Sequence, residues 1–469
     1  MDLKINQTDV YLPVSLSGAD PVGVLYTNGS VFLRGINESG VEQMQTLLKS
    51  ELWDELSRRH LVPKTRILDN NDIPNSMQHF PMVLKQETLA PVSYPHEWSF
   101  EMVKAAALSF LDIVELAEKY GYTSKDAHLY NWLFSGTHPV WVDIGSFISL
   151  PASSNTLPWL ESFYSNVISS LYLWNNGMPY LANRILGSPS KYMSVDEAIA
   201  CRYSFLRGQG SFLSNLRFVF RVIIFVNNIP ENTIFRRSVK HLLAKKPLKK
   251  IVHLQKYIQR LSYITPSIWG EYHTEFFDEH SKVKLDSRFK RILNLIQDTS
   301  PVSILELAGN AGVLSQAIAE TMPDTPVICT DYDSNAIDSL FRRIQLNPLP
   351  NLSMAVYDFM SPEFNSAETN PQIRFKSDCV IALAVTHHLL LSQGYQYDQI
   401  FKIIRSYSDR LVFIEYMPLG LHDGHQAPLL PSWYSQENFE KSFSKFFTLI
   451  HVEQLDSNRI LYIGEIRIE

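Results

Sequence analysis

The sequence predicts an α/β protein in which an α+β domain precedes a doubly wound, mostly parallel sheet. Its 469 residues exceed what one hydrophobic core usually serves, so we expect two or three domains. From about residue 285 onward, helical and strand patterns alternate, which is typical of a parallel sheet covered by helices. The first 92 residues instead contain a hairpin pattern, a helix and a further strand, which is typical of a small sheet packed by a helix.

The N-terminal elements follow from local patterns. Residues 24–36 alternate apolar and polar side chains around Asn28-Gly29, which predicts a hairpin with a type I′ turn. Ser39 and Glu42 have capping-box spacing ahead of a pattern of helical period that runs to Arg59. Two further elements are a strand at 82–86 and a long amphipathic helix at 99–120, which ends at Gly121 as a natural C-cap.

The C-terminal elements are predicted in the order helix, strand, helix, strand, helix, strand, strand, strand. They span 285–298, 302–307, 312–321, 326–331, 334–345, 353–357, 378–384 and 410–416. We therefore divide the chain into a domain at 1–235 (small lobe about 1–92, helical large lobe about 93–235), a basic helical linker at 236–265 and a second domain at 266–469.

Composition narrows the class of protein. The chain is 45% hydrophobic and 19% charged, as ordinary globular proteins are, and its formal charge of -6 argues against a surface built for nucleic acid. Three distant cysteines, Cys201, Cys329 and Cys379, suggest neither a disulfide framework nor a zinc site. The N-terminus lacks signal-peptide features, and the longest apolar stretch, 218–226, is about half of the ~20 residues that cross a bilayer. We expect a cytoplasmic protein without a transmembrane segment, and a buried helix at 218–226.

Charge is unevenly distributed near the expected linker. No acidic residue lies between Glu231 and Glu271, while nine basic residues crowd into positions 236–260. This pattern fits a solvated helical connector, or contact with an anionic substrate or membrane surface. It lacks a recognisable nucleic-acid reader motif, so we expect no clear nucleic-acid partner.

One stretch of the first half, KDAHLYNWLFSGTHPVWVDIGSF at 125–147, contains the types of residue that a phosphotransfer site uses. Asp126 and Asn131 stand five apart, and Asp143 follows after a predicted strand pair. Phosphotransfer needs an acid beside the acceptor hydroxyl, together with an amide and a carboxylate that hold magnesium under the phosphates. The order resembles the catalytic loop and Asp-x-Gly of protein-kinase-like and aminoglycoside-phosphotransferase-like folds, which implies ATP and Mg²⁺ as ligands.

The same stretch departs from that pattern. A Gly-rich phosphate loop and the strand lysine are not evident, Arg34 is the nearest cation in the hairpin, and Lys125 stands where histidine or arginine is usual. Arginine's fixed fork is not equivalent to an ammonium. Three interpretations of the N-terminal domain therefore stay open: a kinase-like fold kept for binding or scaffolding, an active phosphotransferase, and chance similarity in an unrelated helical domain.

The most informative stretch is ILELAGNAGVL, at 304–314. In an open parallel sheet, ligands lie beyond the carboxyl ends of the strands, where small residues allow close approach. The glycines do not have the G-x-G-x-x-G spacing of a dinucleotide site. Glu306 can instead attract the cationic end of S-adenosylmethionine, and Asp331, which closes the next strand, can accept from both ribose hydroxyls. Asp358 and Phe359 follow the third strand and suit the edge and face of adenine.

These motifs resemble the class I S-adenosylmethionine-dependent methyltransferases, with Ala308 in place of their first glycine. Further resemblance comes from WGEYH at 269–273, SDCVIALAVTHHLLL at 377–391 and FIEYMP at 413–418. The chain resembles a bacterial group of methyltransferase-like proteins that includes a rhizobial nodulation-associated protein. The resemblance implies a Rossmann-like fold for the C-terminal domain and a set of cofactor-binding residues. These are Glu306, Gly309, Asn310 and Gly312 for the methionine part, Asp331 for the ribose, Asp358 and Phe359 for adenine, and Tyr272 as a cover.

Methyl transfer is a displacement at a sulfonium, so the protein mainly aligns the groups and excludes water. An oxygen or nitrogen acceptor also needs its proton removed, and His387 and His388 follow the fourth strand at the expected mouth of the pocket. His387 is the first choice of base, and Glu415 is a second candidate. The leading hypothesis is O-, N- or phosphate methylation of a small molecule or glycan that the kinase-like domain binds or presents. A bifunctional kinase-methyltransferase and a non-catalytic S-adenosylmethionine-binding scaffold are the alternatives.

Overall fold

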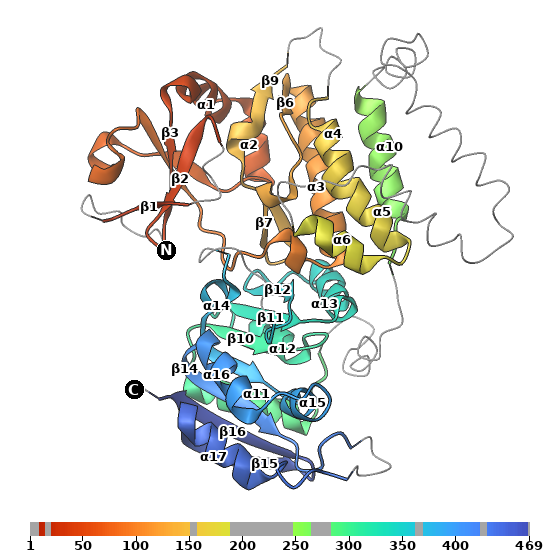
Figure 1. Ribbon diagram of the computed structural model, residues 1–469. Helices are drawn as coiled ribbons and strands as arrows, with labels where there is room; N and C mark the ends of the chain where they lie inside the picture. The colour runs from red at the N-terminus through yellow and green to blue at the C-terminus, as the bar shows by residue number, and fades with distance from the viewer. Residues whose placement is uncertain are drawn as a thin grey trace, which may run out of the picture.

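A computed structural model describes most of the chain (Figure 1). The described residues are 9–14, 20–150, 157–187, 247–263, 283–361, 369–422 and 429–467. The N-terminal elements form the upper half of Figure 1, and the elements that follow α10 form the lower half. The expected domain boundaries near 235 and 265 lie outside the described residues, so they remain predictions.

The chain begins with a small antiparallel sheet in the strand order β1-β2-β3-β5-β4. Its strands are β1 (Leu12–Pro13), β2 (Gly23–Thr27), β3 (Phe32–Ile36), β4 (Thr65–Ile67) and β5 (Met82–Gln86). Helices α1 (Val41–Leu48) and α2 (Glu51–Arg58) follow the hairpin. The predicted hairpin and the strand at 82–86 are confirmed.

Two local predictions in this region are wrong. The hairpin turn is not type I′, because that turn needs a positive φ at both central residues and only Gly29, at 92°, has one. The Asn28 side chain instead accepts from the N–H groups of Ser30 and Val31. The predicted helix is two helices. It divides at Ser50, whose hydroxyl accepts from the N–H of Trp53 and so caps α2, while α1 has no side-chain cap.

The long helix α3 (Phe100–Lys119) is confirmed and forms the centre of the next part, with Gly121 at φ 77° just after it. The strands there pair as β6 with β9 and as β7 with β8, all antiparallel. They are β6 (Tyr122–Ser124), β7 (Trp132–Ser135), β8 (His138–Trp141) and β9 (Phe147–Ser149). The helices are α4 (Leu160–Ser162), a π-helical segment η8 (Phe163–Ile168), α5 (Ser169–Asn175), α6 (Pro179–Leu186) and α10 (Pro247–Arg260). Short 3₁₀ helices lie between these elements: η2 (Glu38–Gly40), η3 (Asn70–Asp72), η4 (Asn75–Met77), η5 (Pro95–Glu97), η6 (Leu129–Asn131) and η7 (Ile144–Ser146).

Among the described residues, the C-terminal half contains a seven-stranded sheet in the order β12-β11-β10-β13-β14-β16-β15. The first five strands are parallel, and β15 and β16 are antiparallel. They are β10 (Ile304–Leu307), β11 (Val327–Asp331), β12 (Leu352–Val356), β13 (Ser377–Ala382), β14 (Ser408–Tyr416), β15 (Phe447–Asp456) and β16 (Arg459–Ile466). The α/β class and the mostly parallel sheet are therefore confirmed.

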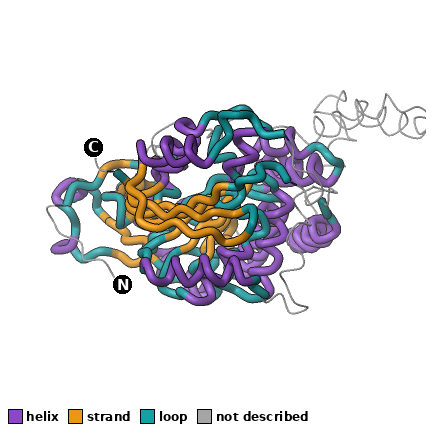
Figure 2. Tube along the Cα trace, turned by 90° about the horizontal axis from the view of Figure 1, so that it is seen from below, coloured by secondary structure: helices purple, strands orange, loops and turns teal. Residues whose placement is uncertain are grey.

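Helices cover both faces of this sheet, and the strands form the layer between helices in Figure 2. One face packs against α11, α12 and α13, and the other against α15, α16 and α17. The helices are α11 (Ser287–Thr299), α12 (Val313–Thr321), α13 (Ser334–Leu346), α14 (Pro371–Arg374), α15 (Thr386–Leu391), α16 (Tyr397–Tyr407) and α17 (Gln436–Phe446). Strand order reverses between β10 and β13, which is where a doubly wound sheet opens a crevice for a ligand.

The core of the first face continues into the N-terminal half. Helix α13 packs on α3, and the rings of Phe134 and Phe341 lie 5.9 Å apart, edge to face. In the described part of the chain, none of the helices is long and apolar enough to cross a membrane. The predicted buried helix at 218–226 lies outside the described residues.

Candidate active site

The turn between β10 and α12 shapes one wall of the site. Ala308, Asn310 and Gly312 all have positive φ, of 54°, 51° and 67°. A Cβ on Gly309 would lie 2.8 Å from Cys329 Sγ, and a Cβ on Gly312 would lie 2.7 Å from Leu340 Cδ2. The backbone is therefore drawn against β11 and α13, and both glycines are needed for that close approach.

Glu306 lies at the carboxyl end of β10, where it is only 4% exposed. Its carboxylate accepts from the Ser315 N–H at 3.1 Å and from the Ser315 hydroxyl. Burial raises the pKa of Glu306 to about 7, although the two bonds from Ser315 oppose that shift. The carboxyl group is thus held at the first turn of α12. Its pKa of about 7 means that it gains or loses its proton near neutral pH.

Asp331 ends β11 and joins that strand to the turn. Its two carboxylate oxygens accept from the N–H groups of Asn310 and Asp333, each at 2.8 Å. Burial raises the pKa of Asp331 to about 6. Asp358 is exposed just beyond β12, where it accepts from the Met360 N–H at 2.9 Å.

These acids share one cavity of about 750 Å³ at the carboxyl ends of the strands. The predicted cofactor residues that line it are Glu306, Gly309, Asn310, Asp331, Asp358 and Phe359. Gly312 shapes the turn without lining the cavity, and Tyr272 lies outside the described residues. The side chains lie at the switch point, where the topology predicts a ligand.

The two histidines occupy different positions. His388 lines the cavity, whereas His387 is 5% exposed and lies behind it, with its ring centroid 4.1 Å from that of His388. Within the described part of the chain, Nδ1 of His387 is buried without a hydrogen-bond partner. Burial lowers the pKa of both rings, that of His387 to about 3, so both are neutral at pH 7.

Glu415, the second catalytic candidate, does not reach the cavity wall. It is fully buried, and its carboxylate bonds Arg288 Nη1 at 3.2 and 3.3 Å and Arg459 Nη1 at 3.2 Å. Arg288 and Arg459 do line the cavity, together with Asp286 and Asp456. Sequence reasoning missed these four residues, because the start of α11 and the start of β16 meet only in the folded chain, and β16 was not predicted.

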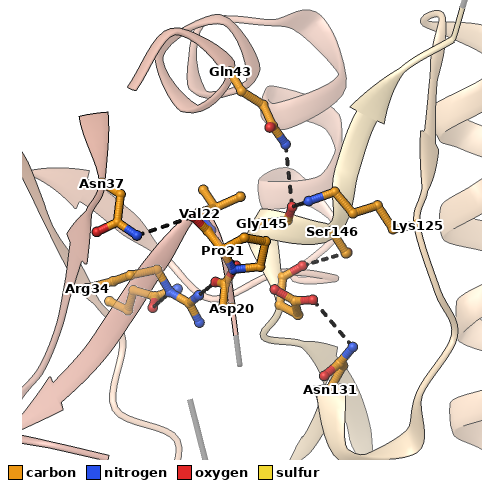
Figure 3. A network of polar contacts seen from close by, with 12 residues as sticks. Asp20, Pro21, Val22, Arg34, Asn37, Gln43, Lys125, Asn131, Gly145 and Ser146 are labelled. Atoms are coloured by element: carbon orange, nitrogen blue, oxygen red, sulfur yellow. Dashed lines mark hydrogen bonds and ion pairs between the residues drawn. The ribbon is translucent and has the colours of Figure 1, made fainter. Parts of the chain in front are cut away.

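The structure also brings together the three residues of the predicted phosphotransfer site, Asp126, Asn131 and Asp143, of which Asn131 is labelled in Figure 3. Asn131 Nδ2 donates to Asp126 Oδ1 at 3.0 Å and to Asp143 Oδ2 at 3.4 Å. Burial raises the pKa of Asp143 to about 6, and the charges of Asp20 and Asp126 add to the shift. Among the described residues, no group of three acidic, histidine or cysteine side chains has the spacing of a metal site.

The cations near the triplet are already engaged, as Figure 3 shows. Arg34 Nη1 donates to Asp20 Oδ2 at 2.6 Å, and Lys125 Nζ donates to the Gly145 carbonyl at 3.0 Å. A Cβ on Gly145 would lie 3.1 Å from Asp20 Oδ2, so the Asp20 carboxylate fills the space between β3 and the Asp143 loop. Arg34 therefore binds a carboxylate of the same chain where the kinase-like pattern has a phosphate-binding lysine.

The basic segment is described only from residue 247. There α10 packs on α3 through buried Ile251, Leu254 and Ile258, and Gln255 donates to Asp112 at 2.8 Å. Residues 247–260 are therefore a helix attached to the N-terminal half. Residues 236–246 lie outside the described part, so the anionic-surface contact stays a prediction.

Comparison with known proteins found distant similarities. No family model matches the chain. The nodulation protein NoeA of Rhizobium meliloti (strain 1021) is 24% identical over 370 residues, which is 72% of each chain. The PH0226 protein from Pyrococcus horikoshii OT3 is 15% identical and covers 42% of this chain and 99% of its own, with a TM-score of 0.33. Magnesium protoporphyrin IX methyltransferase (ChlM) from Synechocystis PCC 6803, with bound SAH, is 14% identical and covers 38% and 81%, with a TM-score of 0.29.

Proposed function

We propose that the chain is an S-adenosylmethionine-dependent methyltransferase that acts on a small molecule or glycan. The observation that carries this proposal is the convergence of Glu306, Asp331 and Asp358 on one cavity at the switch point of the sheet. Carboxylates at that position suit a cation and ribose hydroxyls, and they disfavour the pyrophosphate of a dinucleotide. The residues present therefore fit the cofactor by their chemistry.

Each acid has a role that follows from its position. Glu306 and the Gly309–Gly312 turn would hold the methionine part, Asp331 would accept from the ribose, and Asp358 with Phe359 would contact adenine. The cofactor supplies an activated methyl group on a sulfonium. The protein's own part is to align the acceptor with that group and to keep water out.

His388 is the residue best placed to take a proton from the acceptor. It lines the cavity and its pKa is lowered by burial, so the neutral base form predominates at pH 7. His387 lies one layer deeper and supports the ring of His388. We therefore give His388 the role for which the sequence favoured His387.

The test is calorimetric titration of S-adenosylmethionine and S-adenosylhomocysteine. Asp331→Ala is expected to weaken cofactor binding by about 1–3 kcal/mol, because charge-assisted hydrogen bonds to a ribose are lost. Asp324→Ala is the matched control, since Asp324 is exposed just before the other end of β11. Equal affinity in the wild type and Asp331→Ala would remove the assignment. Tight binding without turnover on a broad acceptor panel would favour the scaffold alternative.

A second candidate function is magnesium-dependent phosphotransfer in the N-terminal half, which would make the chain bifunctional. The contact of Asn131 with both Asp126 and Asp143 supports it, while the Asp20–Arg34 ion pair occupies the cation that phosphates would need. The test is ATP hydrolysis with Mg²⁺, which Asp143→Ala should abolish without changing cofactor affinity. Turnover that persists in that variant, or is absent from the wild type, would leave a binding or scaffolding domain.

A further inference from the structure

The cavity has a second wall, distinct from the three acids. It is built by the first turn of α11 and by the tight turn between β15 and β16, and it carries Asp286, Arg288, Asp456 and Arg459. In the sheet, β14 and β16 lie on the opposite side of the switch point from β11 and β12. The second wall therefore faces the cavity from the side of His388 and away from the tips of β11 and β12.

The two arginines of this wall are held in place by one buried carboxylate. Glu415 is 0% exposed and bonds the Nη1 atoms of both Arg288 and Arg459 at 3.2–3.3 Å. Two guanidinium groups thus share a single buried counter-charge, and Glu415 acts as a positioning residue for both. The planar fork of each arginine is fixed in orientation, as recognition of a carboxylate or phosphate requires.

The acids of the wall are already used. Asp286 Oδ1 accepts from the Phe289 N–H at 2.7 Å and caps α11, while Asp456 Oδ1 accepts from the Asn458 N–H at 2.7 Å. Asp456 Oδ2 lies 3.3 Å from Arg459 Nε, and its side chain is 45% exposed, so water screens its charge. Each of these acids therefore has one carboxylate oxygen engaged by a backbone N–H, and both acids keep the wall from being strongly positive.

The guanidinium nitrogens, in contrast, have spare donors. Among the described residues, Arg288 Nε and Nη2 and Arg459 Nη2 have no hydrogen-bond partner, and none of the three is a fully buried atom. A guanidinium carries five N–H donors, and burial of Arg288 lowers its pKa, as expected of a cation that is incompletely compensated. The wall therefore has unused N–H donors, which suit the oxygen atoms of a ligand.

We propose that Arg288 and Arg459 bind an oxyanion of the methyl acceptor, so that the acceptor carries a carboxylate or a phosphate. This inference rests on the proposed methyltransferase function and names its substrate class. The oxyanion would bind beside His388, across the cavity from the acids that hold the cationic cofactor. The other carboxylate that could reach the arginines is that of the cofactor's own methionine part, and the experiment separates the two sources.

The experiment titrates inorganic phosphate into the full chain after saturation with S-adenosylhomocysteine. Wild type should bind phosphate, and Arg459→Gln should weaken that binding by roughly 10- to 100-fold with unchanged S-adenosylhomocysteine affinity. Arg291→Gln is the matched control, because Arg291 lies one turn along α11 on the surface, paired with Glu453, and should bind phosphate as wild type does. Arg288→Lys keeps a cation beside Glu415 and should also weaken phosphate binding, which guards against a variant that fails to fold.

Three results would overturn the inference. Phosphate that binds equally to wild type and Arg459→Gln, or fails to bind the saturated protein, removes the oxyanion site. A fall in S-adenosylhomocysteine affinity in Arg459→Gln, together with competition between phosphate and S-adenosylhomocysteine, would assign the arginines to the cofactor's carboxylate. These outcomes leave the proposed function intact, whereas wild-type protein that binds no S-adenosylhomocysteine would remove the proposed function itself.

Discussion

If Glu306 holds the cationic end of the proposed cofactor, its ionisation should couple cofactor binding to pH. Burial raises its pKa to about 7 in the free protein, but only the ionised carboxylate attracts a cation. Below pH 7, binding of a cationic ligand therefore requires Glu306 to lose its proton, which weakens binding. The affinity for S-adenosylmethionine should rise as the pH increases from 6 to 8. Because Asp331 has a pKa of about 6, its ionisation adds to the rise at the lower end of this range.

Calorimetry at pH 6, 7 and 8, in buffers with different ionisation enthalpies, measures both the affinity and the proton release. The expected change is at most about tenfold per pH unit below the pKa, with a plateau above it. Glu306→Gln should bind more weakly, with a flatter dependence on pH. An affinity that is constant or falls over this range in the wild type would mean that Glu306 does not hold the cationic end.

The adjacent histidines make a matched pair of substitutions. His388→Ala should slow methyl transfer by about 10²–10⁴-fold at unchanged cofactor affinity, the usual range for a general base. His387→Ala should mainly destabilise the protein, because His387 is buried behind the wall and makes a cavity when truncated. Single-turnover rates with a saturating acceptor check both. A larger loss of rate in His387→Ala than in His388→Ala would reverse the two roles.

At the scale of the element, the turn from β10 to α12 depends on backbone space more than on side chains. A Cβ on Gly309 would lie 2.8 Å from Cys329 Sγ and 2.9 Å from Glu306 Cδ, so Gly309→Ala should displace the carboxylate. We expect this change to cost about 1–3 kcal/mol of stability by overpacking and to weaken cofactor binding. Thermal unfolding and S-adenosylhomocysteine titration measure the two effects.

Ala308→Gly is the control within the same turn. Ala308 has a φ of 54°, which glycine adopts without a Cβ penalty, so this change should leave cofactor affinity unreduced. If Gly309→Ala bound the cofactor as tightly as Ala308→Gly, the close packing of the turn would not matter for the site.

The sequence predicted the elements whose signals are local. Strands β10 to β14 and helices α11 to α13 were predicted to within about two residues, because apolar runs alternate there with amphipathic helices. The acids at the strand ends could be placed in one cavity, since parallel strands end at the same edge. Ser50, by contrast, divides a helix whose apolar period continues across it, which the pattern alone does not reveal.

The features that sequence reasoning missed depend on contacts between elements that are distant in the sequence. The second wall of the cavity, with Arg288 and Arg459, forms because β16 runs antiparallel beside β14. In this pairing Glu415 lies opposite Leu461, and Tyr416 lies opposite Ile460. This register places Arg459 at the tip of β16, next to the end of β14. The distinction between His387 and His388 likewise depends on how the first turn of α15 packs, which no spacing rule for adjacent residues can supply.

At the scale of the whole molecule, a buried ion pair joins the two halves of the chain. Arg374 of α14 bonds Glu97 of η5, with Nη1 to Oε2 at 3.0 Å, and also donates to the Val92 carbonyl. The side chains are 6% and 2% exposed. A second polar contact lies at α13, where Asp338 accepts from the Glu101 N–H at the start of α3 at 2.9 Å. The halves are therefore connected by buried polar contacts as well as by the ring contact of Phe134.

Arg374→Met tests whether this pair makes the halves unfold together. Removing the guanidinium leaves Glu97 buried without its counter-charge, which should cost about 3–5 kcal/mol and separate one thermal transition into two. The double variant Arg374→Met with Glu97→Gln should recover much of the loss, because the unpaired charge is gone. Arg410→Gln is the control, since its ion pair with Asp378 is 40% exposed on the arginine side and should contribute less than about 1 kcal/mol. Calorimetric unfolding of the four proteins decides the question: if Arg374→Met melts in one transition at the wild-type temperature, the ion pair does not couple the two halves.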